Sequence, residues 1–116
     1  MVAFSGTAWA DILVGVAGPL TGPNAAFGAQ LQKGAEQAAA DINAAGGING
    51  KKIELVPVDD ACEPKQGPVA ANRVVNAKIG YVVGPVCSGA AIAAVPIYNN
   101  EGVVAVTPSA TSPALT

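Results

Sequence analysis

Short apolar runs alternate along the chain with longer stretches in which apolar residues recur every three or four positions. The continuous apolar runs at 12–17, 81–84 and 103–106 predict strands of a parallel sheet, because strands covered on both faces need no polar alternation. A fourth strand is predicted at 52–58. Pro57 near its end indicates an edge strand, since proline donates no hydrogen bond to a neighbour.

Three helices are predicted between these strands, at 28–45, 64–78 and 88–100. Gly46-Gly47 and Asn49-Gly50 supply the stop and the turn after the first helix. Ser88 is a natural N-cap for the third helix, and Pro96 within it predicts a kink or a split. The inward stripe is Leu31, Ala35, Ala38, Ile42 and Ala45 in the first helix, and Ala71, Val74 and Val75 in the second.

The alternation of strands and helices predicts an α/β fold. We expect three layers, with a parallel sheet of about four strands joined by right-handed βαβ crossovers. The 116 residues allow one domain or a part of one. After Val106 there is a turn and the possible start of a helix at Pro113, and no feature of the sequence closes the far edge of the sheet.

Composition narrows the classes of function. Hydrophobic residues make up 51% of the chain, which excludes disorder, while aromatic residues make up 4%, which predicts a core of small side chains. The net charge is −2 and the six basic residues are scattered, which argues against a nucleic-acid surface. The chain has no histidine, which removes Ser-His-Asp and Cys-His catalysis and most zinc and iron sites. We therefore expect a protein that is not an enzyme and needs no cofactor or metal.

Two aspartates, Asp59 and Asp60, directly follow the strand at 52–58. Paired acids at a strand end bind magnesium in phosphoacceptor receiver domains, but that site needs a third carboxylate after a later strand. The turns at 84–88 and 107–113 contain no acid. The sequence therefore favours a solvated or capping acid pair.

Two turns with small hydroxylated residues organise the chain: GPVCSG (84–89) and TPSATSP (107–113). Each follows a predicted parallel strand, and ligands of open α/β sheets bind outside the carboxyl ends of the strands. A hydroxyl there, such as Ser88, Ser109 or Thr111, can cap a helix or hold a small anion at a helix N-terminus. One serine alone favours capping, whereas two such turns after successive strands favour a ligand site.

Several segments together resemble a known family. They are DILVGVAGPLTGPNAAFG (11–28), GAEQAAADINAAGGINGKKIELV (34–56), DDACEPKQ (59–66) and VTPSATSPALT (106–116). The chain resembles the type I periplasmic binding proteins, and within them the leucine/isoleucine/valine-binding proteins of bacterial ABC importers. The resemblance covers residues 11–116 and implies that they form an incomplete first lobe of a two-lobed solute-binding domain.

The resemblance also implies a ligand site. Ser88 and Thr111 would donate to the α-carboxylate of an amino acid, and the backbone carbonyl of Ser109 would accept from its α-ammonium, with Ala110 between them. Phe27 and Val86 would line the side-chain pocket. The acid that pairs with the ammonium would come from the other lobe. Implied partners are leucine, isoleucine or valine and an ABC permease, and the implied location is the periplasm.

The N-terminus and the cysteines bear on the same location. Ala8-Trp9-Ala10 has the small-x-small form of a signal-peptidase site, so residues 1–10 are either a signal remnant or a tail. Cys62 and Cys87 form either a disulfide or a pair of buried thiols. Each follows the end of a strand expected to flank the first strand, so we predict a disulfide, which would indicate an oxidising compartment.

Three alternatives remain open from the sequence. A sensor domain of the same fold would bind small amides or aliphatic acids. An enzyme or phosphoreceiver of flavodoxin-like fold is disfavoured by the missing histidine and phosphoacceptor carboxylate. An inactive half-lobe would bind nothing.

Overall fold

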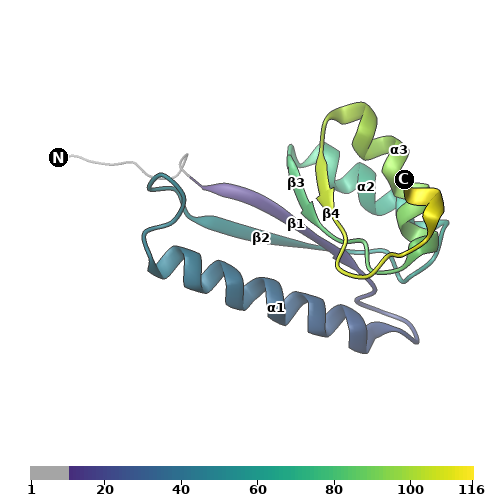
Figure 1. Cartoon of the computed structure of the whole chain (residues 1–116), viewed down its shortest axis with the longest axis horizontal. Helices are drawn as coiled ribbons and strands as arrows, with labels where there is room; N and C mark the ends of the chain where they lie inside the picture. The colour runs from purple at the N-terminus through teal and green to yellow at the C-terminus, as the bar shows by residue number, and fades with distance from the viewer. Residues whose placement is uncertain (1–10) are drawn as a thin grey trace.

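The computed structural model describes residues 11–116, so the signal-peptidase pattern at residues 8–10 lies outside the described part. Four strands alternate with three α-helices, and a 3-10 turn ends the chain (Figure 1). Among the described residues, no helix is long and apolar enough to cross a membrane. The elements are β1 (Ile12–Gly18), α1 (Ala25–Ala44), β2 (Ile53–Asp59), α2 (Gln66–Asn76), β3 (Tyr81–Val83), α3 (Ser88–Glu101), β4 (Val104–Val106) and η3 (Pro113–Leu115).

The four strands form one parallel sheet in the order β2-β1-β3-β4. All seven residues of β1 pair with β2, from Ile12 opposite Ile53 to Gly18 opposite Asp59. The predicted α/β class and strand number are confirmed. Pro57 lies in the edge strand β2, as predicted, where a missing N–H leaves no neighbour unpaired on the open side.

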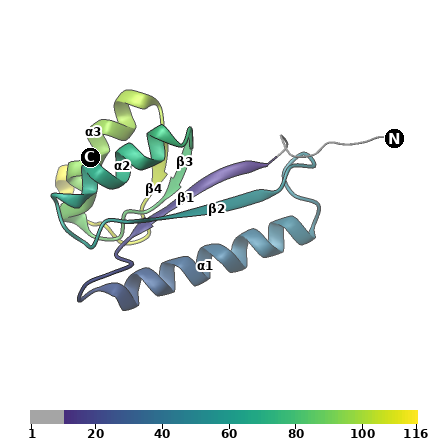
Figure 2. The same cartoon turned by 180° about the vertical axis from the view of Figure 1, so that it is seen from behind.

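Helices cover both faces of the sheet. α1 lies along β1 and β2 on one face, whereas α2 and α3 pack together on the other (Figures 1 and 2). Because all four strands are parallel, their carboxyl ends lie at one edge of the sheet, close to the N-termini of the helices that follow. This is the edge at which the two hydroxylated turns lie.

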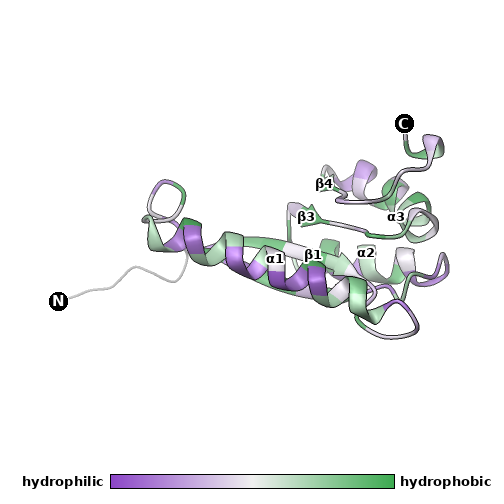
Figure 3. Cartoon of the chain, turned by 60° about the horizontal axis from the view of Figure 1, so that its bottom comes forward, coloured by the Kyte–Doolittle hydropathy of each residue, from purple (hydrophilic) through white to green (hydrophobic). Residues whose placement is uncertain are grey.

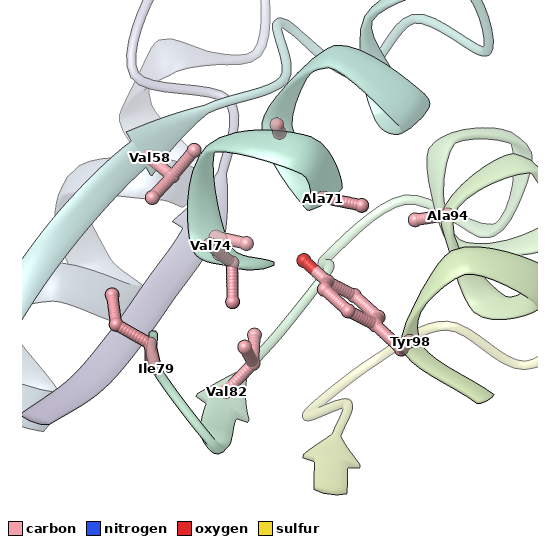
Figure 4. Packing of buried hydrophobic residues seen from close by; sticks show 9 residues of the cluster. Val58, Ala71, Val74, Ile79, Val82, Ala94 and Tyr98 are labelled. Carbon is pink, nitrogen blue, oxygen red and sulfur yellow. The ribbon is translucent and has the colours of Figure 1, made fainter. Parts of the chain in front are cut away.

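The core lies between the sheet and the α2–α3 pair and is built mainly from alanine and valine. Gly67 of α2 approaches the Ala90 carbonyl of α3 so closely that even a methyl group there would collide with it. Among residues 11–116, Tyr98 is the one aromatic side chain in the buried core, and it reaches from α3 towards Ala71 and Val74 of α2 (Figure 4). The buried cluster comprises Ala17, Val58, Ala70, Ala71, Val74, Ile79, Val82, Ala94 and Tyr98.

The predicted inward stripe of the first helix is wrong in its second half. Gly28 and Ala39 are the buried residues of α1, whereas Ala38 is exposed and Ile42 is 37% exposed. The line of contact shifts because Asn43 turns towards the sheet, where its side-chain amide exchanges two hydrogen bonds with the backbone of Ile53. Figure 3 shows the hydrophilic positions spaced along the rest of the helix.

The helix boundaries differ from the prediction in other details. α1 begins at Ala25 rather than at residue 28, and α2 is shorter than the predicted 64–78. α3 runs without interruption through Pro96, so the predicted split does not occur. Gly102 ends α3 with φ of 70°, a left-handed conformation that favours glycine.

One part of the sheet carries an exposed apolar face. Val82 packs into the core, so its neighbour Tyr81 and the cross-strand partner Val104 point to the opposite face, beyond the reach of α1. Their exposed fractions are 55% and 56%, and that of Val106 is 65%. Apolar patches of this kind favour association.

Candidate functional site

The turns that follow β3 and β4 lie side by side at the carboxyl edge of the sheet. β3 and β4 are paired, and the pairing continues past the strands, where the Gly84 N–H donates to the Val106 carbonyl at 2.8 Å. Gly84 has φ of 120°, which places its backbone against the Ala17 carbonyl with no room for a side chain. A cis peptide bond joins Gly84 to Pro85. The two predicted turns therefore form one surface.

Side chains of both turns make the hydrogen bonds that join them. The Thr107 hydroxyl donates to the Pro85 carbonyl at 2.6 Å, and the Ser109 hydroxyl donates to the Val86 carbonyl at 2.8 Å. From the first turn, the side chain of Ser88 takes part through its Oγ, which accepts from the N–H groups of Thr111 and Ser112 at 3.1 and 3.3 Å. Each turn thus fixes the other.

These contacts define what the Ser88 hydroxyl can still bind. A serine hydroxyl has one donor and two acceptor positions. Two backbone N–H groups fill the acceptor positions of Ser88, so its proton remains for a group that accepts. A carboxylate is such a group.

The predicted N-cap role of Ser88 is wrong. Cys87, in extended conformation, is the N-cap of α3, and Ser88 is the first helical residue, with no side-chain cap bond at this end. The Ser88 side chain faces the turn at 107–113 instead, because that turn offers it two N–H donors. The N-terminus of this 14-residue helix, with its positive dipole end, thus lies beside the turn.

A cavity of about 280 Å³ opens between α1 and the two turns. Phe27 and Leu31 of α1 supply its apolar wall on one side, and Val86 and Pro108 supply it on the other. Ser109 also lines it, and Phe27 is 57% exposed. The predicted pocket residues Phe27 and Val86 therefore line one cavity, together with Ser109.

The other predicted residues lie beside this cavity. Ala110 and Thr111 line a separate hollow of about 350 Å³ between α3 and the end of the chain. Ser88 is joined to Thr111 by the cross-turn hydrogen bond. All six predicted ligand residues thus belong to the two linked turns or to the start of α1.

The sequence of residues 11–116 matches the family described as Periplasmic binding protein. The chain belongs to this family. This assignment agrees with the parallel sheet and with the position of the candidate site at the carboxyl ends of its strands.

Relatives of this periplasmic binding protein carry names that describe amino-acid binding. It is 56% identical over 110 residues to "Amino acid binding protein" of Pseudomonas aeruginosa, covering 94% of this chain and 29% of the relative. It is 53% identical over 116 residues to "Leu/Ile/Val-binding protein" of Escherichia coli, covering 99% of this chain and 32% of the relative.

Solved structures show the same fold. The branched-chain amino acid transporter substrate binding protein of Streptococcus pneumoniae, in complex with isoleucine, matches with a TM-score of 0.84 and 43% identity. A solute binding protein of an ABC transporter from R. palustris, in complex with 4-hydroxybenzoate, matches with a TM-score of 0.80 and 27% identity. Each match covers 90% of this chain and 30% or 28% of the other. The chain therefore spans about 30% of the length of the proteins that it matches.

A disulfide joins Cys62 to Cys87 in this periplasmic binding protein, as predicted from their positions after two strands. The strands β2 and β3 flank β1, so the loops that follow them meet at the same edge, with a Cα–Cα distance of 5.4 Å. Cys87 directly precedes Ser88. The disulfide therefore ties the start of α3 to the loop that follows β2.

Asp59 holds the loop between β1 and α1. Its carboxylate accepts hydrogen bonds from the Leu20 and Ala61 N–H groups and from both the N–H and the hydroxyl of Thr21. Burial raises the pKa of this carboxyl, but the Thr21 hydroxyl and the backbone donors outweigh it and lower the pKa below its ordinary value. Asp59 thus stabilises the loop that leads to Phe27.

Asp60 is fully buried, so the predicted solvated pair is wrong for this residue. Neither aspartate caps a helix, because both carboxylates accept from N–H groups of loops. Asp60 Oδ1 accepts from the Cys62 N–H, but neither Asp60 Oδ2 nor Tyr98 Oη has a hydrogen-bond partner among residues 11–116. Burial and the negative charge of Asp59 raise the pKa of Asp60. The hydrogen bond from the Cys62 N–H lowers it but does not outweigh them. Burial and the Asp60 charge raise the pKa of Tyr98 to about 12.

Among the described residues no group of three acidic, cysteine or histidine side chains is arranged to hold a metal ion.

Neutralising the two neighbouring aspartates is expected to affect stability differently. Asp59→Asn should lower the free energy of unfolding at pH 7 by about 1–2 kcal/mol, because a carboxylate accepting several hydrogen bonds is lost. Asp60→Asn should leave it unchanged or raise it, because an amide keeps the bond from Cys62 without burying a charge.

The pH dependence separates the two residues further. The lowered pKa of Asp59 means that its stabilisation is present above its unfolded pKa of about 4 and is lost as pH falls through the folded value. The raised pKa of Asp60 means that stability falls as pH rises from about 4 through the folded value. Urea unfolding of both variants between pH 3 and 7 measures this, and equal losses in both at pH 7 would contradict it.

Sequence reasoning missed several residues around the site. Thr107 was part of the second turn but not a named candidate, although a threonine directly after a strand and before a proline is a recognisable turn former. Leu31 belongs to the predicted inward stripe and lies against Gly18 of β1, and it also contributes to the cavity wall. Gln30 and Pro108 complete the lining. Contacts across two separate turns depend on strand order, which periodicity alone does not fix.

Proposed function

We propose that this protein captures a branched-chain amino acid as the substrate-binding component of an ABC importer, using the first of two lobes. The observation that supports this most strongly is the Ser88 hydroxyl, which two N–H groups leave with a proton to donate at the N-terminus of α3. Relatives named for leucine, isoleucine and valine binding support the same ligand class.

The carboxylate of the ligand would lie between the two turns. Ser88 would donate its hydroxyl and N–H, and Thr111 would donate from the second turn. Donors at a helix N-terminus stabilise an anion without a buried countercharge, because the helix dipole already favours negative charge there.

The rest of the amino acid would lie towards α1. The backbone carbonyl of Ser109 would accept from the ammonium, and the aliphatic side chain would enter the cavity lined by Phe27, Leu31 and Val86. The hydroxyl of Ser109 donates to the Val86 carbonyl, so only the backbone of Ser109 would serve the ligand. Asp59 and Asp60 have no part in binding the ammonium, since their carboxylates serve the backbone around residues 20–21 and 61–62.

We further propose that the protein works in the periplasm and delivers its ligand to a membrane permease. The disulfide supports an oxidising compartment, and the relatives' names support a transporter. In this arrangement residues 1–10 would be a signal remnant or tail, and residues 11–116 would belong to the first lobe.

The nearest alternative is a protein of the same fold that binds a carboxylic acid without an ammonium group. The R. palustris structure with 4-hydroxybenzoate shows that the fold can hold one. The two functions differ in whether the Ser109 carbonyl is needed as an acceptor.

An NMR titration of the ¹⁵N-labelled chain distinguishes these functions. Leucine is expected to shift the amide signals of Ser88, Thr111 and Val86 in a saturable way at millimolar concentration. The matched control is 4-methylpentanoate, which is leucine without the ammonium and should bind more weakly. Equal binding of the two acids would favour the alternative, and no shift at Ser88 and Thr111 would contradict the carboxylate site.

A further inference from the structure

Thr107 directly follows β4 and has a hydroxyl whose hydrogen-bonding capacity is full. It donates to the Pro85 carbonyl at 2.6 Å and accepts from the Ser109 and Ala110 N–H groups at 3.2 and 2.8 Å. A threonine hydroxyl offers one donor and two acceptor positions, so none is left for a ligand. This is the reverse of Ser88, whose proton stays available.

The partners of Thr107 lie in both turns of the proposed site. Pro85 precedes Val86 of the cavity wall, and Ser109 and Ala110 precede Thr111. The two accepted bonds shape the local turn, as threonine often does after a strand. The bond that Thr107 donates to the Pro85 carbonyl has a different effect, because it fixes the second turn to the first.

Ser109 makes a second bond of the same direction, two residues further along the second turn and one residue further along the first. Its hydroxyl donates to the Val86 carbonyl, so consecutive carbonyls of the first turn accept from alternate residues of the second. The pair holds Val86 and Ser109 together on the side of the cavity that the two turns form.

We infer that Thr107 is a positioning residue for amino-acid binding: its hydroxyl holds the second turn so that Thr111 and the Ser109 carbonyl face the ligand. The inference rests on the proposed function. Thr107 itself does not contact the ligand. Ser109 assists it through the neighbouring cross-turn bond.

The exposure of Thr107 distinguishes a role in positioning the turn from a role in stabilising the core. Thr107 and Ser109 are both exposed, and neither belongs to the buried cluster. Loss of the hydroxyl therefore leaves the core packing unchanged, whereas it removes the contacts that order the turn. A substitution should act on binding and on local amide exchange with little effect on the unfolding temperature.

The test compares Thr107→Val, which keeps the shape and loses the hydroxyl, with Thr107→Ser, which keeps the hydroxyl. In Thr107→Val the Ala110 amide should exchange with solvent about tenfold faster, and leucine should bind about tenfold more weakly. Thr107→Ser should stay within about threefold of the unsubstituted protein in both measurements. Thr116→Val, which loses a hydroxyl bonded to Pro113 at the end of the same segment, is the second control and should change neither.

The two readouts separate this inference from the proposed function. Amide exchange is measured without ligand, so faster exchange in Thr107→Val alone supports the hydroxyl as the link between the turns. Faster amide exchange in Thr107→Val together with no leucine binding by the unsubstituted protein would contradict the proposed function. The same result would still support the hydroxyl as the link between the turns. Unchanged exchange and unchanged leucine affinity in Thr107→Val would overturn the inference, as would equal effects of the valine and serine substitutions.

Discussion

Grafting residues 11–116 onto the remainder of the Escherichia coli Leu/Ile/Val-binding protein should strengthen leucine binding at least a hundredfold over the 116-residue chain. In the proposed arrangement the chain supplies the carboxylate donors, and a second lobe supplies the acid for the ammonium. That acid contributes about 1.5–3 kcal/mol as a charged hydrogen bond. Enclosing the aliphatic side chain contributes a further ~1.5–3 kcal/mol.

Together these terms correspond to a factor between about one hundred and ten thousand, because every 1.4 kcal/mol is about tenfold in affinity. Hinge closure around the ligand is the step that makes them available. Calorimetry with leucine, isoleucine and valine on the chain and on the graft measures the difference. The graft is feasible because the replaced segment is 53% identical over 116 residues. Micromolar binding by the 116-residue chain alone would show that one lobe suffices.

Removing the disulfide should lower the free energy of unfolding by roughly 3 kcal/mol. The bond joins residues 25 positions apart. In the chain-entropy model a closed loop of this length restricts the unfolded state by about that amount. The loss is large for a domain whose total stability is about 5–15 kcal/mol.

A Cys62→Ser, Cys87→Ser double variant measures this effect by urea unfolding, without leaving a single reactive thiol. Reduction of the unsubstituted protein should reach the same stability as the double variant. The reductant should have no effect on the double variant, which is the matched control. Equal stability of the oxidised protein and the double variant would show that the disulfide adds nothing to the fold.

Much of the fold follows from sequence pattern. Continuous apolar runs located three of the four strands, and the strand at 52–58 was also predicted. The alternation with helical stripes predicted the parallel sheet, because parallel strands need crossovers. Errors arose where tertiary contacts outweigh local pattern. Asn43 binds the backbone of Ile53 and turns the end of α1, which left the apolar Ile42 more exposed than its spacing predicts.

The candidate site was predicted in part. The two turns could be found because hydroxylated residues follow neighbouring parallel strands, and the residues for the ligand came from the family resemblance. The links between the turns could not be found. Ser88 appeared to be an N-cap because the helix start is visible in sequence, whereas the Thr111 and Ser112 N–H groups that occupy it come from 23 and 24 residues away.

The buried aspartate was also beyond sequence reasoning. Asp59 and Asp60 are adjacent and chemically identical, but Asp59 is the last residue of β2 and Asp60 is the first residue beyond it, where its side chain is fully buried. One meets the backbone of the β1–α1 loop, and the other meets the interior near Tyr98. Their environments depend on the residue at which β2 ends, which the pattern of apolar residues does not define.

The central claim is that Ser88 and Thr111 hold the carboxylate of the ligand. Its most direct test is leucine calorimetry on the grafted protein carrying Ser88→Ala and Thr111→Ala, beside a graft carrying Thr111→Ser, which keeps a hydroxyl. We expect the double variant to lose at least about a hundredfold in affinity, since each hydrogen bond to a charged group contributes ~1.5–3 kcal/mol, while the serine variant retains most of it. Leucine affinity in the double variant equal to that of the unsubstituted graft would remove both residues from the site.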